Sequence, residues 1–337
     1  MNYFITGGTG FIGTHLTNLL HEVHPEAKIY NLDIIEPGTP LPTVKNYKPA
    51  LRKGEEHAAT FIYCDVRQPI ELEKVDITPD DVIFNFAAVH RTPGHPDPAY
   101  FETNIRGAEN VCAFAERYGI RKIVFTSSIA PYGAAEELKE ETTLPMPNTP
   151  YGISKLVAEK IHQTWQAGGE GRQLTIVRPG VVFGRGENGN FTRLYWGIRG
   201  HKFMYPGRKD TIKACIYVKE LVRFMLYRLE HHDSGVELYN CCYEPAYTIE
   251  HIVESMKRVT NMKVKVPFMP GWLIMTAAGI AGALGSPMGI CPARVRKLQI
   301  STNICGKKLS ASGYRFHYTF EEALADWYKD NGNLYLQ

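Results

Sequence analysis

Short apolar runs alternate with amphipathic stretches through the first half of the chain. The amphipathic stretches carry apolar residues at helical spacing, as at Leu16, Leu19 and Leu20. Strands interleaved with helices are typical of a parallel sheet that helices cover on both faces. The sequence therefore predicts an α/β protein with a doubly wound, Rossmann-type sheet. Strands are predicted at residues 2–6, 28–32, 60–64, 82–86, 122–126 and 174–177, and helices at residues 11–23, 100–118 and 151–166.

The regular alternation ends after Gly184. Residues 185–210 are rich in basic and turn-forming residues, so this stretch is predicted to be mostly loop. Further strands or helices are predicted at residues 212–218, 220–231 and 248–260. The second half is therefore expected to form a smaller and less regular α/β part.

Composition narrows the class of protein. A formal net charge of +3 with 22% charged residues indicates neither a nucleic-acid-binding surface nor a solvating tail. The seven cysteines are irregularly spaced and form no CxxC pattern, so no metal site is expected. An odd number of cysteines, with no secretory signal at the start, favours reduced thiols in a cytoplasmic protein.

One uncharged segment, residues 266–291, complicates this picture. Two of its prolines, Pro270 and Pro287, bracket only sixteen residues, whereas a membrane-spanning helix needs about 20 apolar ones. Two interpretations remain open. The segment is either a buried or lid-forming helix of the substrate-binding part, or a peripheral contact with the inner face of a membrane.

Three glycines follow the first predicted strand and open the first predicted helix. Gly7, Gly10 and Gly13 permit a tight turn and let a pyrophosphate approach backbone N–H groups at the positive end of a helix. Asp33 ends the second strand, where a carboxylate accepts from an adenosine ribose hydroxyl. The same carboxylate would repel a 2′-phosphate, so NAD is expected in preference to NADP. Asp65 ends a later strand and is a candidate acceptor for the adenine amino group.

A second motif, Tyr151-Gly-Ile-Ser-Lys155, lies further along the chain. In a helix these two side chains lie one turn apart on one face. The Lys155 ammonium then favours the tyrosinate form of Tyr151, whose ordinary pKa is about 10. A base beside a nicotinamide indicates hydride chemistry at a carbinol or carbonyl carbon.

Together these motifs resemble the extended short-chain dehydrogenase/reductase family, in particular its nucleotide-sugar epimerase branch. The resemblance runs from residue 2 to about residue 229 and weakens in the last hundred residues. It implies a diphosphate loop, a ribose ligand, an adenine contact and a strand end that lines the cofactor. The implied NAD-binding residues are Gly7, Gly10, Phe11, Ile12, Gly13, Asp33, Asp65, Val66, Phe86, Ala87, Ala88, Asn104, Thr126, Tyr151, Lys155 and Pro179.

The resemblance also implies a catalytic set. The segment Phe125-Thr-Ser-Ser-Ile-Ala-Pro-Tyr-Gly133 matches the family's serine segment and places the catalytic hydroxyl at Ser128, with Ser127 as the neighbouring candidate. Ser128 would bind the reacting oxygen, Tyr151 would transfer its proton, and Lys155 would polarise Tyr151 and hold the nicotinamide ribose. The resemblance implies Ser128, Asn190 and Lys213 as substrate ligands. His90 and Arg91 are further candidates from their position, because they directly follow the strand end that lines the cofactor, where an anionic group of the substrate would lie.

Departures from the family pattern separate the candidate reactions. Dehydratases of this family carry acidic residues after the catalytic hydroxyl, but Ile129 and Ala130 stand here, so a dehydratase is not expected. Val181 stands where the family commonly has an asparagine that touches the substrate diphosphate, which leaves the substrate's head group open.

The resemblance favours an NAD-dependent epimerase that acts on a nucleotide- or lipid-linked diphosphate sugar through a transient keto intermediate. A keto-sugar reductase, a hydroxysteroid-type dehydrogenase and a non-catalytic redox-sensing regulator are the alternatives. A homodimer is expected. The NAD-binding domain is expected to span residues 1–180, completed by about 212–232, and the substrate-binding domain to span 181–211 and 233–337.

Overall fold

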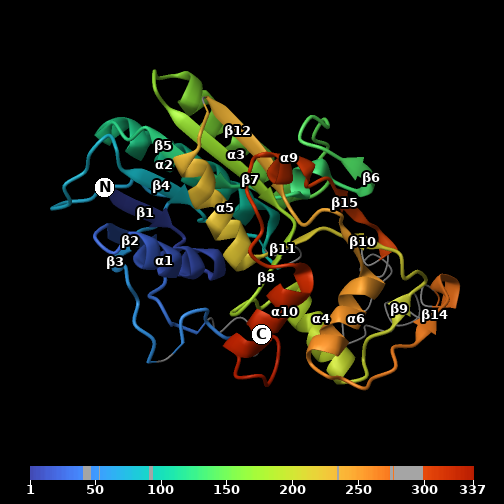
Figure 1. Ribbon diagram of the computed structural model, residues 1–337. Coiled ribbons are helices and arrows are strands. Elements are labelled where there is room, and N and C mark those ends of the chain that lie inside the picture. The colour runs from blue at the N-terminus through green and yellow to red at the C-terminus, as the bar shows by residue number, and fades with distance from the viewer. Residues whose placement is uncertain (41–46, 53, 91–93, 234, 274–275, 277–298) are drawn as a thin grey trace.

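A seven-stranded parallel sheet forms the centre of the computed structural model, which describes residues 1–337 except 41–46, 53, 91–93, 234, 274–275 and 277–298 (Figure 1). The strands are β1 (Asn2–Thr6), β2 (Lys28–Asp33), β3 (Thr60–Tyr63), β4 (Val82–Asn85), β5 (Lys122–Thr126), β7 (Gln173–Pro179) and β12 (Val236–Cys241). They lie in the order β12-β7-β5-β4-β1-β2-β3, and every neighbouring pair is parallel. The expected doubly wound α/β fold is confirmed.

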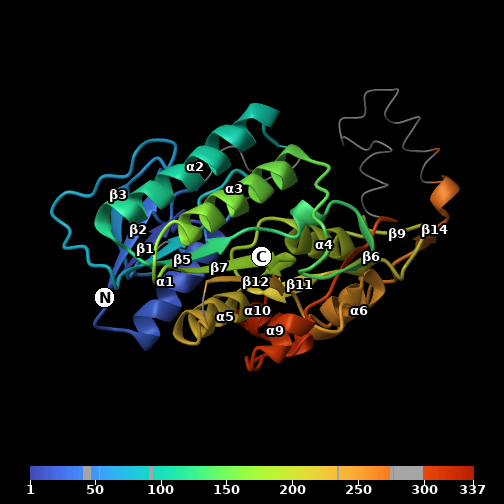
Figure 2. The same cartoon turned by 90° about the horizontal axis from the view of Figure 1, so that it is seen from above.

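Helices cover both faces of this sheet (Figure 2). Helices α1 (Phe11–Val23) and α5 (Val218–Glu230) pack on one face, and α2 (Asp97–Tyr118) and α3 (Pro150–Ala167) pack on the other. Each pair closes a separate apolar layer, with Leu16 and Leu221 fully buried in the first and Val111 and Ala158 in the second. Because both faces are covered, the central strands are apolar throughout instead of alternating.

Helix α3, which carries the tyrosine motif, has a well-defined start. The Thr149 side chain accepts a hydrogen bond from the backbone N–H of Gly152 at 3.1 Å, and Pro150 occupies the first turn. A threonine cap and an early proline both favour a helix beginning at this point. The start of α3 fixes the height of Tyr151 relative to the sheet.

The smaller part of the molecule lies beyond the carboxyl ends of the large sheet (Figures 1 and 2). A four-stranded sheet has the order β13-β10-β15-β6, and two further parallel pairs join β11 to β8 and β14 to β9. An aromatic core around Phe183, Phe320 and Trp327 holds these elements together. The elements of this smaller part are β6 (Ala135–Lys139), β8 (Val181–Phe183), α4 (Asn190–Arg199), β9 (Tyr205–Pro206), β10 (Ile212–Lys213), β11 (Cys215–Tyr217), β13 (Tyr247–Thr248), α6 (Ile249–Val259), β14 (Phe268–Met269), β15 (Thr302–Ile304), α9 (Lys307–Ala311) and α10 (Phe320–Asp330).

The stretch 185–210 contains a helix where loop was expected. Helix α4 buries Phe191, Tyr195 and Ile198, which share one face at helical spacing. Its first turn is held from outside the helix, because the buried Glu187 carboxylate accepts from the Thr192 backbone N–H at 2.8 Å. The glycines and arginines around this apolar face obscured the helical pattern.

Strand β12 lies in the range 233–337 that was expected to belong to the substrate-binding domain. Its residues pair with β7 in the large sheet, from Val236 opposite Leu174 to Cys241 opposite Pro179. The chain therefore returns to the large sheet after α5 before it completes the smaller part. Within the described residues, no helix is both long and apolar enough to cross a membrane.

Candidate active site

The parallel sheet gathers the predicted residues at one edge. Gly7 follows β1, Asp33 ends β2, Ala87 follows β4, Ser128 follows β5 and Pro179 ends β7. Carboxyl ends of parallel strands lie at the same edge, and this edge is where ligands bind in open α/β sheets. The topology alone therefore brings residues more than 170 positions apart into one region.

The glycine loop needs its glycines for close packing. Gly7 has φ +70°, and a Cβ there would lie 2.7 Å from the backbone nitrogen of Ala87. A Cβ on Gly13 would lie 2.5 Å from the Cα of Gly8. Without side chains, the loop lies directly against the end of β4 and the start of α1. No side chain in the described structure caps α1 at Gly10, so the positive helix end faces outward for an anion.

Asp33 holds the glycine loop from the tip of β2. Its carboxylate accepts from the backbone N–H groups of Thr9 at 3.0 Å and Ile35 at 3.2 Å. Burial raises the pKa of this carboxyl, while the two backbone donors act in the opposite direction. The carboxylate thus stands beside the loop that would receive a dinucleotide.

In the region expected to hold the adenine, the acidic side chain is paired with a basic one. Asp65 pairs with Arg67 through three hydrogen bonds of 2.6 to 3.0 Å, and this pairing lowers the pKa of the Asp65 carboxyl. The Asp65 side chain is therefore engaged by a neighbouring cation. Val66 is buried, and its carbonyl accepts from the Asn110 side chain at 2.7 Å.

The Asn104 side chain joins helix α2 to the loop after β4 and to helix α3 by hydrogen bonds. Its amide oxygen accepts from the Val89 backbone N–H at 2.8 Å, and its amide nitrogen donates to the Val89 carbonyl at 3.1 Å and to Ser154 Oγ at 2.8 Å. The side chain is buried on α2. Asn104 thus ties the loop after β4, which includes the expected cofactor-lining residues Phe86, Ala87 and Ala88, to helix α3.

Tyr151 and Ser128 face each other across the site. Both side chains are partly exposed, and a hydrogen bond joins the Ser128 hydroxyl to the Tyr151 phenol. Burial raises the pKa of Tyr151 to about 12, and the bond to Ser128 acts against this increase. The phenol therefore holds its proton near neutral pH until a nearby positive charge stabilises the anion.

Lys155 lies one helical turn below Tyr151. Its ammonium donates to the carbonyl of Thr126 at 2.6 Å and lies 4.6 Å from the centre of the Phe125 ring. Burial lowers the pKa of Lys155 to about 7, whereas the nearby Glu159 carboxylate raises it. The amine is thus poised to exchange a proton near neutrality. The Thr126 hydroxyl beside it is buried without a hydrogen-bond partner in the described structure.

Ser127 points away from the reacting side. Its hydroxyl donates to Glu159 Oε1 at 2.5 Å, and it is buried. Arg178 binds the same carboxylate through two hydrogen bonds of 2.8 and 2.6 Å. The geometry therefore favours Ser128 over Ser127 as the hydroxyl that faces a substrate.

The Glu159–Arg178 pair was not found by sequence reasoning. Two signals were available in the sequence. Glu159 stands four residues after Lys155, on the same helical face, and Arg178 is the one charged residue of β7.

The expected substrate ligands are dispersed around the site. His90 is exposed after β4, and Arg91 lies outside the described residues. Asn190 is exposed at the start of α4, where its amide oxygen accepts from Arg193 at 2.8 Å. Lys213 lies on β10, and its ammonium donates to the carbonyl of Ile300 at 2.7 Å.

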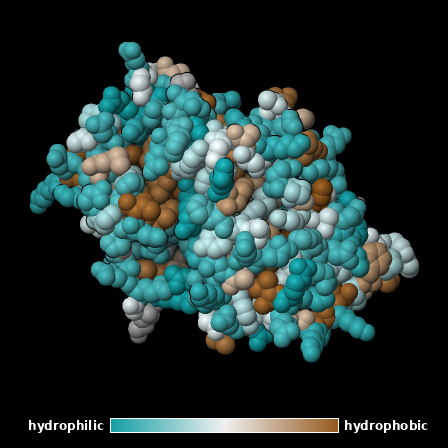
Figure 3. All heavy atoms as spheres, viewed as in Figure 1, coloured by the Kyte–Doolittle hydropathy of each residue, from teal (hydrophilic) through white to brown (hydrophobic). Residues whose placement is uncertain are grey.

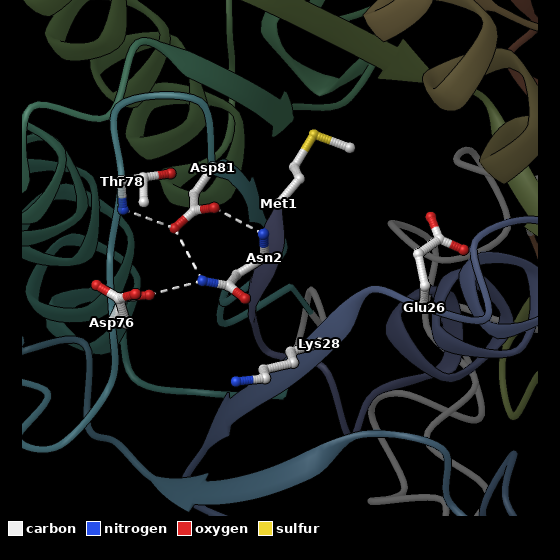
Figure 4. A pocket seen from close by; sticks show the side chains of 7 residues that line it. All are labelled: Met1, Asn2, Glu26, Lys28, Asp76, Thr78 and Asp81. Carbon is white, nitrogen blue, oxygen red and sulfur yellow. Dashed lines mark hydrogen bonds between the residues drawn. The ribbon is translucent and has the colours of Figure 1, made fainter.

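A cavity of about 240 Å³ lies at the opposite edge of the sheet, at the amino ends of β1 and β2 (Figure 4). Asp81 dominates it, yet this carboxylate already accepts from the Asn2 backbone N–H, the Asn2 side chain and the Thr78 N–H. These contacts tie the strand starts together. The predicted catalytic and cofactor-binding residues lie at the other edge of the sheet.

The residues at the carboxyl edge fit a dinucleotide. The glycine loop offers backbone donors at a helix end, Asp33 offers a ribose acceptor, and Lys155 offers a cation beside Tyr151. The close backbone approaches at Gly7 and Gly13 are the contacts that such a loop requires.

Known proteins resemble this chain in sequence and in fold. The chain is 30% identical to an N-acetyl-alpha-D-glucosaminyl-diphospho-ditrans,octacis-undecaprenol 4-epimerase from Escherichia coli, over 96% of this chain and 93% of that protein. It is 30% identical to a UDP-glucose 4-epimerase from Lacticaseibacillus casei, over 80% of this chain and 85% of that protein. The crystal structure of UDP-glucuronic acid 4-epimerase from Bacillus cereus in complex with NAD has the same fold, with a TM-score of 0.72 and 19% identity over 98% of this chain and 99% of that one.

A family model described as the NAD dependent epimerase/dehydratase family matches residues 3–242. The match and the relatives confirm the resemblance predicted from the sequence, and with it the NAD cofactor and the assignment as a sugar-epimerase type of enzyme. The chain belongs to the NAD dependent epimerase/dehydratase family.

Proposed function

We propose that this protein inverts carbon 4 of a sugar that is linked through a diphosphate to a polyprenyl lipid. The observation that carries the proposal is the Ser128–Tyr151–Lys155 set beside the glycine loop. The choice of a lipid carrier is supported by the similarity to the undecaprenol-linked epimerase, which extends over 96% of this chain.

The residues supply the acid–base part of the reaction. Bound NAD would supply the hydride acceptor and donor for the sugar carbon. Tyr151 removes the proton from the sugar hydroxyl and later returns it, while Ser128 donates a hydrogen bond to the same oxygen. The Lys155 cation stabilises the tyrosinate from one helical turn away. Positioned acid–base catalysis of this kind contributes about 10²–10⁴-fold to the rate.

The residues after Ser128 favour epimerisation over water elimination. Ile129 and Ala130 carry no group that can donate a proton, and Ile129 packs in a small apolar cluster with Tyr132. A transient keto sugar in this site would therefore keep its neighbouring hydroxyl and be reduced again.

The diphosphate is proposed to bind on the smaller part of the molecule. Lys213 is the leading candidate ligand. It lies on β10, just before β11 in the chain. Strand β11 pairs with β8, and β8 directly follows the carboxyl end of β7, so Lys213 is connected to the edge of the large sheet that carries the site. Asn190 and His90 are weaker candidates, since each lies on an exposed surface. Replacing Lys213 with alanine should raise KM about tenfold or more with little change in kcat, because a remote phosphate is held equally in the ground and transition states.

A lipid-linked substrate requires access to a membrane surface. The described part of the apolar segment exposes Phe268, Trp272 and Leu273, which are 51%, 71% and 41% accessible. Lys263 and Lys265 are exposed just before them. Apolar side chains are visible at the end of the molecule that carries β14 (Figure 3). Aromatic residues beside lysines suit peripheral binding to an anionic leaflet. We therefore propose that the protein is cytoplasmic and binds peripherally at the inner face of the membrane.

A homodimer is proposed as the working form. Ile153 and Val157 lie one turn apart on the outer face of α3 and are 40% and 36% accessible. An apolar stripe on an outer helix suits a symmetric contact with a second copy. Analytical ultracentrifugation checks this: a dimer that Ile153→Glu dissociates supports the contact, and a wild-type monomer contradicts it.

The proposed function is tested by offering two matched substrates. Purified protein with NAD is incubated with N-acetylglucosaminyl-diphospho-undecaprenol in detergent, and separately with UDP-N-acetylglucosamine. We expect the 4-epimer to form from the lipid-linked sugar with no net absorbance change at 340 nm, and much less from the nucleotide sugar. Stoichiometric NADH formation would indicate a dehydrogenase instead, and faster turnover of the UDP sugar would exclude the lipid carrier. Tyr151→Phe is the matched inactive control.

A further inference from the structure

A buried ion pair lies directly behind the catalytic residues. Glu159 and Arg178 are 1% and 3% accessible, and two hydrogen bonds of 2.8 and 2.6 Å join them. A buried ion pair is often no more stable than an apolar replacement, so its presence calls for a role beyond stability.

The pair joins the segments that carry the catalytic groups. The Glu159 carboxylate also accepts from Ser127, the residue next to Ser128, at 2.5 Å. Arg178 precedes Pro179, the last residue of β7, whose carbonyl accepts from the backbone N–H of Ile129 at 3.3 Å. The guanidinium also lies 4.7 Å from the centre of the Tyr132 ring, and the Tyr132 hydroxyl donates to Asn240 at 2.9 Å. Helix α3, the end of β5 and the end of β7 therefore meet at one carboxylate.

Glu159 also lies one helical turn beyond Lys155. Residues four apart on a helix have neighbouring side chains, so the carboxylate is the anion next to the Lys155 ammonium. We propose that Glu159 is a positioning residue that keeps a proton on Lys155 and fixes the strand end that carries Ser128. This inference rests on the proposed acid–base roles of Tyr151 and Lys155.

The other titratable groups around Lys155 do not replace Glu159. On α3, Tyr151 is neutral near pH 7, because burial raises its pKa to about 12. His162 is also neutral, because burial lowers its pKa to about 4. Arg178 on β7 is a cation and acts against the proton on Lys155. Tyr132 stacks under Arg178, and burial raises its pKa. Glu141 lies further away, where its carboxylate accepts from the Asn240 N–H at 2.8 Å.

Removing the carboxylate has a defined consequence. An anion about 6 Å from an amine shifts its pKa by about one to two units at an effective dielectric constant of about 20. Loss of Glu159 should therefore lower the pH at which Lys155 releases its proton. Loss of a negative charge also favours the Tyr151 anion, so the whole pH profile of kcat should move toward lower pH.

The test uses three variants with different charges. The double variant Glu159→Gln/Arg178→Met removes both charges and leaves none unpaired, which protects the fold. Glu159→Gln alone leaves Arg178 unpaired, which adds to the acidic shift if the protein folds. Glu159→Asp keeps the charge and shortens the side chain, so it separates charge from geometry. Circular dichroism and Tm identify variants that fold.

Lys155 is followed directly by NMR of its side-chain methylene groups between pH 5 and 10, with Lys155→Met to assign its signal. We expect titration near pH 7 in the wild-type protein, about one unit lower in the double variant, and within about half a unit of wild type in Glu159→Asp. The kcat profile should shift by the same amount. An unshifted Lys155 titration in the folded double variant, or in Glu159→Gln, would overturn the inference. The NMR titration needs no substrate, so an incorrect proposed function would leave this result readable.

Discussion

At the scale of single residues, Tyr151 is the group on which we propose that turnover depends. Its phenol contacts Ser128, lies one turn above Lys155 and is partly exposed at the carboxyl edge of the sheet. Tyr151→Phe removes only the oxygen that transfers the proton. We expect kcat to fall at least about 100-fold while the Kd for NAD and the Tm stay near their wild-type values. Isothermal titration calorimetry measures the Kd. A variant that keeps more than about a tenth of wild-type kcat would contradict the role.

We propose that Asp33 controls the choice between NAD and NADP. Its carboxylate faces the glycine loop and accepts hydrogen bonds from the backbone N–H groups of Thr9 and Ile35. Neither of these two partners is a cation that could neutralise a 2′-phosphate. We expect NAD to bind at least about tenfold more tightly than NADP, because two anions would otherwise be desolvated together. Calorimetry with both cofactors measures the difference. Asp33→Asn should reduce it, and equal affinities in the wild-type protein would refute the assignment.

At the scale of elements, the glycine loop and α1 form one tightly packed unit. A methyl group on Gly13 would lie within 2.5 to 2.7 Å of three backbone atoms of Gly8, so the loop would have to move. Gly13→Ala should weaken NAD binding at least tenfold and lower stability by about 1–3 kcal/mol, as overpacking typically does. Urea unfolding measures the stability.

Gly197 provides a matched control on α4. A methyl group there would meet the Phe203 side chain at an ordinary 3.4 Å. Gly197→Ala should therefore leave NAD binding unchanged and raise stability by up to about 1 kcal/mol, because alanine favours a helix. Equal effects of the two substitutions would show that the loop is not the constrained element.

Most strands of the large sheet were predictable from sequence, whereas strand β12 and, in the smaller part, helix α4 were not. Strands β1 and β5 and helix α1 have the predicted bounds, because apolar periodicity and the glycines fix them locally. Helix α4 was missed, because its first turn depends on the buried Glu187. Strand β12 was missed because its position is set by pairing with β7, some sixty residues earlier.

The candidate site was predictable where one motif carries it. Gly7, Asp33, Tyr151 and Lys155 could be named from spacing and strand ends, and the parallel sheet then gathers them. Glu159 and Arg178 each left a signal in the sequence, but their pairing was missed, because it joins a helix to a strand end through tertiary contacts. The family resemblance favoured Ser128 over Ser127, and the contact of Ser127 with Glu159 supports that choice, because it shows which hydroxyl turns inward.

At the scale of the whole molecule, two buried histidines link stability to pH. His15 donates from Nε2 to the Arg185 carbonyl, and His162 contacts the Asn85 side chain and the Ala158 carbonyl. Burial lowers the pKa of each histidine to about 4. The unfolded chain binds protons at these histidines near pH 6.5, so it carries more protons than the folded protein between about pH 6.5 and 4. Stability should therefore be full above pH 6.5 and fall as the pH is lowered, by up to about 1.4 kcal/mol per pH unit for each histidine.

Urea unfolding at pH 7, 6 and 5 measures this dependence. His162→Asn should reduce the slope between pH 6 and 5, whereas substitution of the exposed His21 should leave it unchanged. An identical slope in the wild-type and His162→Asn proteins would contradict the account of a neutral buried His162.

The central claim is that the enzyme removes a hydride from the sugar and returns it to the same carbon. The most direct measurement uses N-acetylglucosaminyl-diphospho-undecaprenol with deuterium at carbon 4, incubated with the protein and NAD, followed by mass spectrometry of the released sugars. We predict that the 4-epimer forms and retains the deuterium at carbon 4, with no deuterium accumulating in free cofactor. A product that has lost the label, with deuterium recovered in released NADH, would contradict the claim and indicate a dehydrogenase.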